Sequence, residues 1–386
     1  MVNFKYKLFA AFFNFYRRLF KVNSSNVSLI IINKNKFRGN LRYIYEELNQ
    51  RDKSLKYNII SRDEYSLNGI SSAGSFLMKI FELLRLFILK SYRLAVSRYI
   101  FLNDNFLPMA YMNLNQESDV IQVWHGPGAF KKFGLSFVTD PNLINLEKQI
   151  SDKLNYVIVS SKNMIPFYKE AFGVNEEKIL PLGIPRVDYY FKESNIGELR
   201  NNFDKLYPQS KGKNIILYAP TFRDDPVHNK NILENLDIDL FNKELGDQYI
   251  LAVRLHPRMN NDEMLKNCDV LNVTSYKDEK KLLLLADILI TDYSSIIIEY
   301  ALLNKPMIFY PYDYKYYNEI ERGFYFDYKE FVPGPIAHNT NELIQIIKGN
   351  SYDLNKIKKF VDLQFDYLDG NSTKRIVDYI LGIDKS

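Results

Sequence analysis

Short apolar, β-rich runs alternate with helical stretches along most of this 386-residue chain, and this alternation constrains the fold more than any other feature. Short runs separated by helices are typical of parallel sheets that are buried on both faces. The expected strands of a first series are Val27–Ile32, Tyr57–Ser61, Tyr99–Asn103, Val120–Trp124 and Tyr156–Ser160. Those of a second series are Asn214–Ala219, Tyr249–Leu255, Val270–Val273, Ile288–Thr291 and Met307–Tyr310. The helical stretches between them include Leu41–Arg51, Lys162–Phe172 and Ser294–Leu303.

A polar stretch at residues 191–213 separates the two series and predicts two domains. The expected fold class is α/β, with two doubly wound, Rossmann-like domains. We place an N-terminal helix at 1–22, a first domain at 23–200 and a second domain at 201–386. The composition, 46% apolar and 25% charged, is that of a soluble globular enzyme and excludes collagen and wholesale disorder. The single cysteine, Cys268, excludes an internal disulfide and suits a reducing compartment.

The N-terminal segment 1–22 is both basic and apolar. Its longest uncharged run, Leu8–Tyr16, has nine residues, which is too few to span a bilayer. A signal peptide needs a small-residue cleavage site next, and Arg17-Arg18 stands there instead. Apolar side chains recur at helical spacing, at Phe4, Leu8, Phe12, Phe15 and Leu19. The pattern predicts an amphipathic helix that either lies on an anionic membrane surface or packs on the domain.

A second basic and apolar stretch covers residues 76–100, where charges interrupt the apolar runs too often for a membrane span. A core helix and a membrane-surface helix both fit this stretch. The net charge of +5 favours anionic partners, such as phosphates or acidic lipid, over basic ones.

The segment 120–134 reads VIQVWHGPGAFKKFG and puts His125 at the end of an expected strand. Ligands of open α/β sheets bind at the carboxyl ends of the strands. Histidine there can act as a general base near neutral pH, and the glycines that follow let backbone approach a ligand closely. The pattern favours a functional His125 over a hydrogen-bonded structural histidine in a tight turn.

Two further expected strands end in cationic residues. The segment 217–225, LYAPTFRDD, carries Arg223, whose guanidinium fork suits phosphate, although a surface pair with Asp224 or Asp225 is the alternative. The segment 251–257, LAVRLHP, carries Arg254 and His256 two residues apart and therefore on one face of an extended strand. This pair fits a phosphate site, and a strand-end salt bridge is the alternative.

The segment 286–310 is the most informative. Its strand at Ile288–Thr291 leads through Asp292-Tyr293 into Ser294 and Ser295, which are expected to begin a helix. The serines fit ordinary N-cap residues. A helix N-terminus also binds phosphate through its free N–H groups. Glu299 lies about one turn further on, where it could accept both hydroxyls of a ribose. We favour a site for a nucleoside diphosphate.

Other chemistries lack their signatures in the sequence. There is no P-loop, no G-x-G-x-x-G after the first strand, and no H-x-x-x-H or cysteine cluster for zinc. The sequence therefore predicts no bound cofactor and no metal site, and leaves a metal requirement open. The lysine runs are short and lack interleaved stacking aromatics, so nucleic acid is not an expected partner.

Taken together and in order, the motifs W-H-G with K-K-x-G, G-I-P-R-x-D, Y-A-P-T-F-R, R-L-H-P and T-D-Y-S-S-x-x-x-E resemble the CDP-glycerol glycerophosphotransferases. These enzymes build teichoic acids and related capsule polymers. The resemblance covers roughly residues 99–370. It implies a GT-B architecture, in which two Rossmann-like domains face a cleft and the C-terminal domain holds the nucleotide. One departure is Pro127-Gly128-Ala129, where family members often carry Thr-Pro after W-H-G.

The resemblance also implies roles for individual residues. His125 would be the base for the acceptor hydroxyl, and His256 would lie beside the donor phosphates as a second catalytic residue. The loop that lines the donor site would be Gly126, Pro127, Gly128 and Ala129. The other substrate-binding residues would be Arg186, Thr221, Phe222, Arg223, Arg254, Leu255, Ser294, Ser295 and Glu299.

The implied reaction transfers glycerol phosphate, or a related polyol phosphate, from CDP-glycerol or CDP-ribitol to a hydroxyl of a lipid-linked saccharide or polymer, with release of CMP. The enzyme would lie peripherally at the cytoplasmic face of the cell membrane. One rival is a GT-B glycosyltransferase that uses a sugar nucleotide. A second is a catalytically inactive, membrane-associated scaffold in polymer export.

Overall fold

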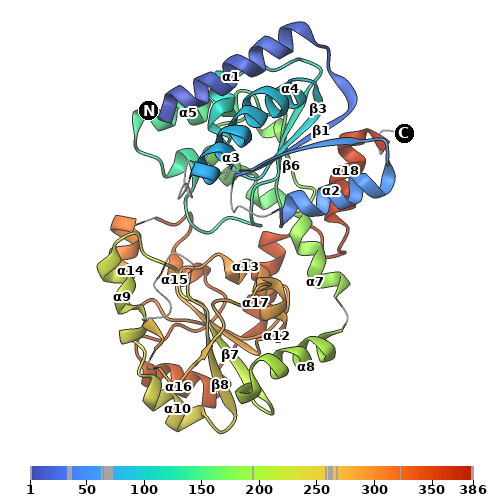
Figure 1. Ribbon diagram of the computed structural model, residues 1–386. Coiled ribbons are helices and arrows are strands. Elements are labelled where there is room, and N and C mark those ends of the chain that lie inside the picture. The colour runs from blue at the N-terminus through green and yellow to red at the C-terminus, as the bar shows by residue number, and fades with distance from the viewer. Residues whose placement is uncertain are drawn as a thin grey trace. The chain divides into compact units, whose positions relative to one another are not determined.

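The computed structural model describes residues 2–32, 37–61, 64, 73–193, 195–256, 259, 264–266, 268–321 and 323–383. The chain forms two compact units (Figure 1). The first unit comprises Met1–Gly128, Phe133–Asp188 and Phe365–Ser386. The second comprises Ala129–Lys132 and Tyr189–Gln364. Each unit has its own parallel sheet, which confirms the α/β class with parallel sheets.

The first unit contains a six-stranded sheet in the order β2-β1-β3-β4-β5-β6. Its neighbouring strands are all parallel. The strands are β1 Asn23–Ile31, β2 Lys56–Ser61, β3 Ser97–Leu102, β4 Asp119–Gln122, β5 Tyr156–Ile158 and β6 Ile179–Leu180. The strand order reverses between β1 and β3, and ligands of such sheets bind beside this switch point, outside the carboxyl ends of the strands.

The helices of the first unit cover this sheet. They are α1 Val2–Leu19, α2 Asn40–Arg51, α3 Ala73–Leu84, the π-helix η2 Arg85–Lys90, α4 Ser91–Ala95, α5 Pro141–Ser151, α6 Ile165–Phe172 and α18 Ser372–Leu381. Short 3₁₀ turns join them, at η3 Leu107–Tyr111, η4 Gly134–Ser136, η5 Lys162–Met164, η6 Glu176–Lys178 and η7 Pro185–Asp188. Central strand residues such as Leu29 and Ile100 are fully buried, as expected for a sheet covered on both faces.

Helix α1 packs on the first unit through one face and exposes apolar side chains on another. Phe9, Ala10 and Phe13 are at most 1% exposed, and the Phe9 ring lies 6.1 Å from that of Phe87 in η2. The exposed apolar residues of α1 and the segment after it are Phe4, Leu8, Phe15, Leu19 and Phe20. A helix is therefore present in the expected segment. Its buried face packs on the domain, which was one of the two alternatives for this helix.

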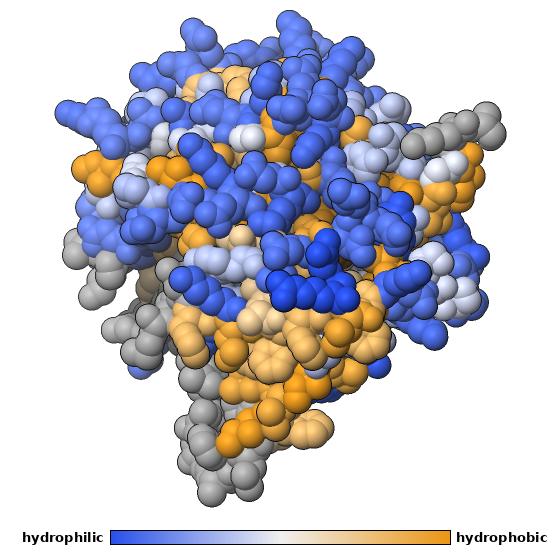
Figure 2. Space-filling view, turned by 90° about the horizontal axis from the view of Figure 1, so that it is seen from above, coloured by the Kyte–Doolittle hydropathy of each residue, from blue (hydrophilic) through white to orange (hydrophobic). Residues whose placement is uncertain are grey.

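The stretch 76–100 is not a single helix. It divides into α3, η2 and α4, and β3 already begins at Ser97. Its exposed apolar residues are Met78, Ile80, Phe81, Leu84, Ile88 and Leu89. Figure 2 shows apolar side chains gathered in the lower part of the face seen from above. Within the described ranges, no helix combines the length and apolarity that crossing a membrane requires.

The second unit contains a five-stranded sheet in the order β11-β10-β7-β8-β9, again with parallel neighbours. The strands are β7 Asn214–Tyr218, β8 Tyr249–Val253, β9 Leu271–Asn272, β10 Ile288–Thr291 and β11 Met307–Phe309. This is the Rossmann order, with its switch point between β7 and β10. The segments that follow these two strands are the expected Y-A-P-T-F-R and D-Y-S-S motifs.

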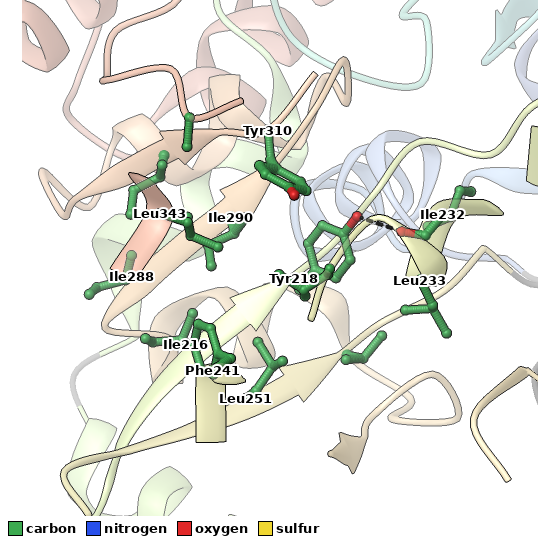
Figure 3. Close-up of a cluster of buried hydrophobic side chains, with 14 of the residues drawn as sticks. Ile216, Tyr218, Ile232, Leu233, Phe241, Leu251, Ile288, Ile290, Tyr310 and Leu343 are labelled. Atoms are coloured by element: carbon green, nitrogen blue, oxygen red, sulfur yellow. Dashed lines mark hydrogen bonds between the residues drawn. The ribbon is translucent and has the colours of Figure 1, made fainter. Parts of the chain in front are cut away.

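The helices of the second unit are α7 Tyr189–Lys192, α8 Ile196–Leu206, α9 Pro226–Glu234, α10 Ile238–Leu245, α12 Glu279–Leu285, α13 Ile296–Ala301, α14 Tyr314–Tyr316, the π-helix η9 Tyr317–Glu321, α15 Tyr328–Phe331, α16 Thr340–Lys348 and α17 Leu354–Gln364, with a 3₁₀ turn η8 at Pro208–Ser210. Side chains from β7, β8 and β10 pack against those of α10 and α16 in one apolar core (Figure 3). Tyr218 keeps its hydroxyl satisfied in this core by donating to the Ile232 carbonyl.

The division of the chain differs from the expected boundary between 200 and 201. The second unit begins at Tyr189, and residues 365–386 return to the first unit. Asp188 explains the return, because its buried carboxylate accepts hydrogen bonds from the backbone N–H groups of Ser372 and Thr373. A carboxylate is stabilised at a helix N-terminus, so Asp188 holds the start of α18 against the first unit. The polar stretch at 191–213 instead belongs to the second unit.

Candidate active site

The turn after β4 presents His125. Trp124 has a φ of +50°, which is uncommon for a bulky residue and turns the chain sharply beyond the strand. Its ring stacks on Phe133 at 5.2 Å and meets the edge of Phe172 at 5.2 Å, so aromatic packing holds this conformation. The His125 side chain stays 39% exposed at the carboxyl edge of the sheet. The expected placement at the end of a strand is therefore confirmed.

Asp104 is a neighbour of His125 that the sequence patterns did not single out. Its Oδ2 lies 3.8 Å from Nδ1 of His125. Asp104 follows β3, the strand that pairs with β4, so the sheet order brings the two loops together. A carboxylate on this side of the ring can orient the imidazole. The signal in the sequence was the pair Asp104-Asn105 directly after the expected strand Tyr99–Asn103.

Arg186 and Asn40 hold the backbone of the His125 turn. The Arg186 Nη1 donates to the carbonyl of His125 at 3.1 Å. Asn40, at the start of α2, donates from Nδ2 to the carbonyls of Val123 and Trp124 at 3.0 and 2.9 Å. Its Oδ1 accepts from the backbone N–H of Arg186 at 3.0 Å. The structure thus brings the expected residue Arg186 to His125 and adds Asn40, which joins the two turns.

The loop from Gly126 to Ala129 is fixed at one end and open at the other. A Cβ added to Gly126 would meet nothing within 4 Å, so this backbone faces open space. Gly128 has a φ of +67°, which glycine adopts without strain. Its N–H donates to Ser160 Oγ and its carbonyl accepts from Tyr168 Oη, both at 3.1 Å. Pro127 and Ala129 are buried.

In the second unit, Arg223 is buried rather than presented to a ligand. Its side chain is 0% exposed, and Nε and Nη2 donate to the two carboxylate oxygens of Asp313 at 2.7 and 2.8 Å. Nη2 also donates to Asp292 Oδ2 at 2.8 Å, and Nη1 donates to the Thr221 carbonyl. This differs from the expectation that Arg223 contacts the donor, and the partners differ from Asp224 and Asp225. Asp292 and Asp313 approach Arg223 only in the folded chain. The sequence therefore could not reveal that Arg223 is buried.

The surroundings of Arg223 keep it charged. Burial opposes the charge, but Asp292 and Asp313 outweigh it and hold the pKa of Arg223 above its ordinary value. The guanidinium also lies 5.0–5.3 Å from the centroids of three tyrosine rings, Tyr293, Tyr312 and Tyr317. Burial and the two carboxylates raise the pKa of Tyr293 as well. Thr221 joins the cluster, because its N–H donates to Asp292 Oδ1 at 2.7 Å. Arg223 therefore positions the loops after β7 and β10.

The segment after β8 separates Arg254 from His256. Arg254 donates to the Tyr276 carbonyl at 3.1 Å and lies 3.7 Å from Glu279 Oε2, which is the strand-end ion pair of the alternative interpretation. The exposed His256 instead stacks on Phe222, with ring centroids 4.9 Å apart. Because β8 ends at Val253, the two-residue period of a strand does not govern these side chains. Leu255, an expected substrate contact, is 2% exposed and belongs to the apolar core.

The start of α13 lies beside the switch point of the second sheet. Ser295 occupies the N-cap position without a side-chain capping bond, and it is exposed. Ser294 Oγ accepts from the Ile296 N–H at 3.4 Å. Glu299 is 6% exposed and accepts from Tyr190 Oη at 2.9 Å. The serines thus directly precede the short helix that carries Glu299, and Tyr190 is a partner that the motif did not indicate.

Each unit therefore places polar groups at the carboxyl edge of a parallel sheet. In the first unit these are His125, Asp104 and Arg186. In the second they are His256, which stacks on Phe222, and the serines with Glu299. Among the residues that the structure describes, no three histidine, cysteine, aspartate or glutamate side chains gather as metal ligands would. The fold and these edges define the class of the protein: an α/β protein of two units, each with a parallel sheet and with candidate ligand sites at the ends of its strands.

The chain belongs to the CDP-glycerol:poly(glycerophosphate) glycerophosphotransferase family, whose model matches residues 11–382. It is 35% identical over 94% of its length to a teichoic acid poly(ribitol-phosphate) polymerase of Bacillus spizizenii, of which it spans 57%. It is 34% identical over 97% of its length to a teichoic acid ribitol-phosphate primase of the same organism, of which it spans 94%. A teichoic acid glycerol-phosphate primase of Bacillus subtilis is 32% identical, with 92% of this chain and 91% of that protein aligned.

Solved structures support the fold. A variant of the wall teichoic acid polymerase TagF aligns with 97% of this chain and 94% of its own at a TM-score of 0.75 and 24% identity. A UDP-GlcNAc 2-epimerase from Neisseria meningitidis aligns with 92% of this chain and 100% of its own at a TM-score of 0.58 and 13% identity. At these identities the likeness concerns the fold alone. The resemblance inferred from the sequence motifs is thus confirmed as family membership.

Proposed function

We propose that this chain transfers a polyol phosphate, glycerol phosphate or ribitol phosphate, from a CDP-alcohol to a hydroxyl of a lipid-linked teichoic acid or capsule precursor, and releases CMP. The observation that carries the proposal is the family match, which spans both units and every candidate site residue. Relatives of similar identity are named for ribitol phosphate and for glycerol phosphate, so the proposal includes both donors.

The proposed step is a direct displacement at phosphorus. The acceptor oxygen forms a bond to the β-phosphorus of the CDP-alcohol while the bond from that phosphorus to the bridging oxygen breaks. The bridging oxygen leaves with CMP, and the proton of the acceptor hydroxyl passes to His125. Asp104, 3.8 Å from Nδ1, would orient the ring so that Nε2 takes the proton. Catalysis of this kind depends on positioning and charge stabilisation rather than on covalent intermediates.

The second unit would hold the donor. The positive end of the α13 helix dipole and the hydroxyls of Ser294 and Ser295 suit the diphosphate. Glu299 would accept from the ribose hydroxyls, and Tyr190 fixes its carboxylate. His256, held on Phe222, would stabilise charge on the phosphates. Arg223 would act indirectly, by fixing the loops that carry Thr221 and the serines.

The proposed acceptor is lipid-linked, and the first unit offers a surface that fits a membrane. The exposed faces of α1 and of the α3–η2 segment carry apolar side chains, and Lys5, Lys7, Arg17 and Arg18 flank those of α1. Apolar side chains with basic neighbours favour binding to the interface of an anionic bilayer. We propose that this surface holds the enzyme peripherally at the cytoplasmic face of the membrane.

The test of the reaction measures CMP released from CDP-glycerol and from CDP-ribitol, with UDP-sugars in parallel and a lipid-linked disaccharide as acceptor. CMP from a CDP-alcohol alone supports the proposal and identifies the donor. UDP from a UDP-sugar would instead make the chain a glycosyltransferase and reopen the roles of His125 and His256. A chain that binds neither a CDP-alcohol nor a UDP-sugar in calorimetry would be a scaffold.

The membrane proposal is tested with a triple variant, Phe4→Ser, Phe15→Ser and Leu19→Ser. These side chains are 57–69% exposed, so the variant spares the buried face of α1. We expect co-sedimentation with phosphatidylglycerol vesicles to fall at least about tenfold, since each apolar side chain contributes about 1.5–3 kcal/mol on full burial. Leu206→Ser with Ile320→Ser is the matched control, because both residues are exposed in the second unit. Equal sedimentation of the triple variant and the wild type would refute the surface.

A further inference from the structure

The segment Ala129–Lys132 interrupts the first unit. The residues before it, up to Gly128, and those after it, from Phe133, belong to the first unit, whereas these four belong to the second. His125 lies four residues before Ala129. Four extended residues span at most about 14 Å, so a shift of this segment reaches the His125 turn through the covalent chain.

Phe130 anchors the segment in the second unit. Its side chain is 2% exposed and lies among aromatic rings, with centroid distances of 5.1 Å to Phe324 and 5.4 Å to Phe331. Its carbonyl accepts from the Tyr325 N–H at 3.1 Å, and the Lys132 N–H donates to the Gly323 carbonyl at 3.0 Å. Aromatic burial and two backbone hydrogen bonds therefore fix the segment in place.

The rings around Phe130 continue to the proposed donor loops. Tyr328 lies 6.2 Å from Phe130 and donates from Oη to the Asp292 carbonyl at 2.9 Å. Its ring is also 5.5 Å from that of Tyr293. Asp292 in turn accepts from Thr221 and pairs with Arg223. The anchor of the His125 segment and the frame of the donor loops are thus one packed cluster.

Hydrogen bonds hold both residues at which the chain passes from the first unit to the second, Gly128 and Ala129. Gly128 is hydrogen-bonded within the first unit through both its N–H and its carbonyl. The next N–H, of Ala129, donates to Gln364 Oε1 at 3.2 Å. Gln364 is 0% exposed and is the last residue before the chain returns to the first unit. The outward crossing is therefore tied to the return crossing by a buried hydrogen bond.

We infer that Phe130 is a positioning residue, which couples the turn that carries His125 to the donor-binding unit. The inference rests on the proposed function, because it assigns His125 and the donor to the two units. A loosened Phe130 leaves the His125 turn and the donor loops each intact but releases the segment of chain that joins them. The expected defect is therefore in turnover and not in donor binding.

The kinetic test compares Phe130→Ala with the matched control Phe326→Ala. Phe326 stacks on Phe331 at 4.1 Å in the same cluster but lies outside the segment Ala129–Lys132. We expect Phe130→Ala to lower kcat by up to about 100-fold, the cost of a displacement of about 1 Å in a reacting geometry. KM for the donor and its calorimetric Kd should stay within about twofold. Phe130→Leu, which keeps most of the apolar volume, should restore kcat.

A second readout does not depend on activity. Amide hydrogen exchange of residues 122–128 should become faster in Phe130→Ala than in Phe326→Ala. If Phe130→Ala fails to fold, Gln364→Leu takes its place, since it removes the acceptor of the Ala129 N–H and leaves the rings intact. Unchanged kcat and unchanged exchange in the folded variant would overturn the inference. Faster exchange in a chain that releases no CMP from any CDP-polyol would support the coupling and contradict only the proposed function.

Discussion

The two units use the carboxyl edges of their sheets differently. In the first, His125 is 39% exposed beside a carboxylate that is itself 28% exposed. In the second, Arg223 is 0% exposed between two carboxylates and three tyrosine rings. Both residues follow a central strand of their sheet, and both belong to motifs in which a cationic or titratable side chain comes just after the strand. Whether a polar residue can meet a ligand is therefore not decided by its position beyond a strand. It is decided by the residues that fold around it.

The comparison assigns a type of role to each edge. An imidazole that is partly exposed can exchange protons with a substrate. A buried guanidinium whose N–H groups are engaged cannot reach one, but it can hold two loops rigidly. The first edge is thus suited to chemistry and the second, at Arg223, to support.

The largest expected effect is on the first edge. His125→Ala should lower kcat by about 1,000-fold, within the range that general acid–base catalysis contributes. Donor binding in calorimetry should persist, since the proposed donor site lies in the second unit. Asp152→Asn, in the same unit, should leave kcat unchanged. An equal loss of CDP-glycerol binding in His125→Ala would make His125 a structural or donor-site residue and remove the contrast between the units.

The next effect concerns the second edge. Arg223→Met should lower the free energy of unfolding by about 3–5 kcal/mol, because it leaves Asp292 and Asp313 buried without their cation. Urea unfolding measures the change. Asp224→Asn, at the exposed position directly after Arg223, should change this free energy by less than about 0.5 kcal/mol. A stable Arg223→Met with weaker donor binding would show that Arg223 serves the ligand after all.

A smaller effect on donor binding is expected at Glu299 and its partner Tyr190, and it distinguishes the roles of these two residues. Glu299→Gln should raise KM for the donor by about tenfold, since a hydrogen bond to a charged group contributes about 1.5–3 kcal/mol. Tyr190→Phe removes only the bond that fixes this carboxylate and should raise KM by about threefold or less. The kcat of both variants should be near that of the wild type. If Tyr190→Phe has the larger effect, Tyr190 itself is the ligand contact.

The smallest effect is a pH dependence in the first unit. Burial raises the pKa of Glu147 in α5 above 4.5, with a bond from Asn105 opposing and the charge of Asp104 assisting the rise. The folded state then binds more protons, so this contribution to stability is present below pH 4.5 and is lost as the pH rises through the raised pKa. Glu147→Gln should make the midpoint of urea unfolding less dependent on pH across this window. An unchanged pH profile would contradict it.

Much of the frame was predictable from the sequence, because periodicity and turn residues are local. Strand β10, Ile288–Thr291, has the predicted bounds, and most others end one or two residues early. Strand β6 was not predicted, since its two residues carry no periodic signal. The family motifs singled out His125 and Arg186, but not the hydrogen bond from Arg186 to the His125 carbonyl. The roles of Arg223 and Leu255 were not predictable, because Asp313 lies 90 residues beyond Arg223 and burial is decided by packing.

The hydrogen bonds between Asp188 and the start of α18 affect the order in which the two units can be completed during synthesis. The first unit lacks its last helix until residues 372–381 have been made, whereas every part of the second unit precedes Phe365. Domains generally fold in order of synthesis, the N-terminal one first. Here the ribosome releases a complete second unit before a complete first one. The nascent chain thus holds its proposed catalytic turn on an unfinished unit until α18 has been made, and a chain truncated before α18 is left with that unit incomplete.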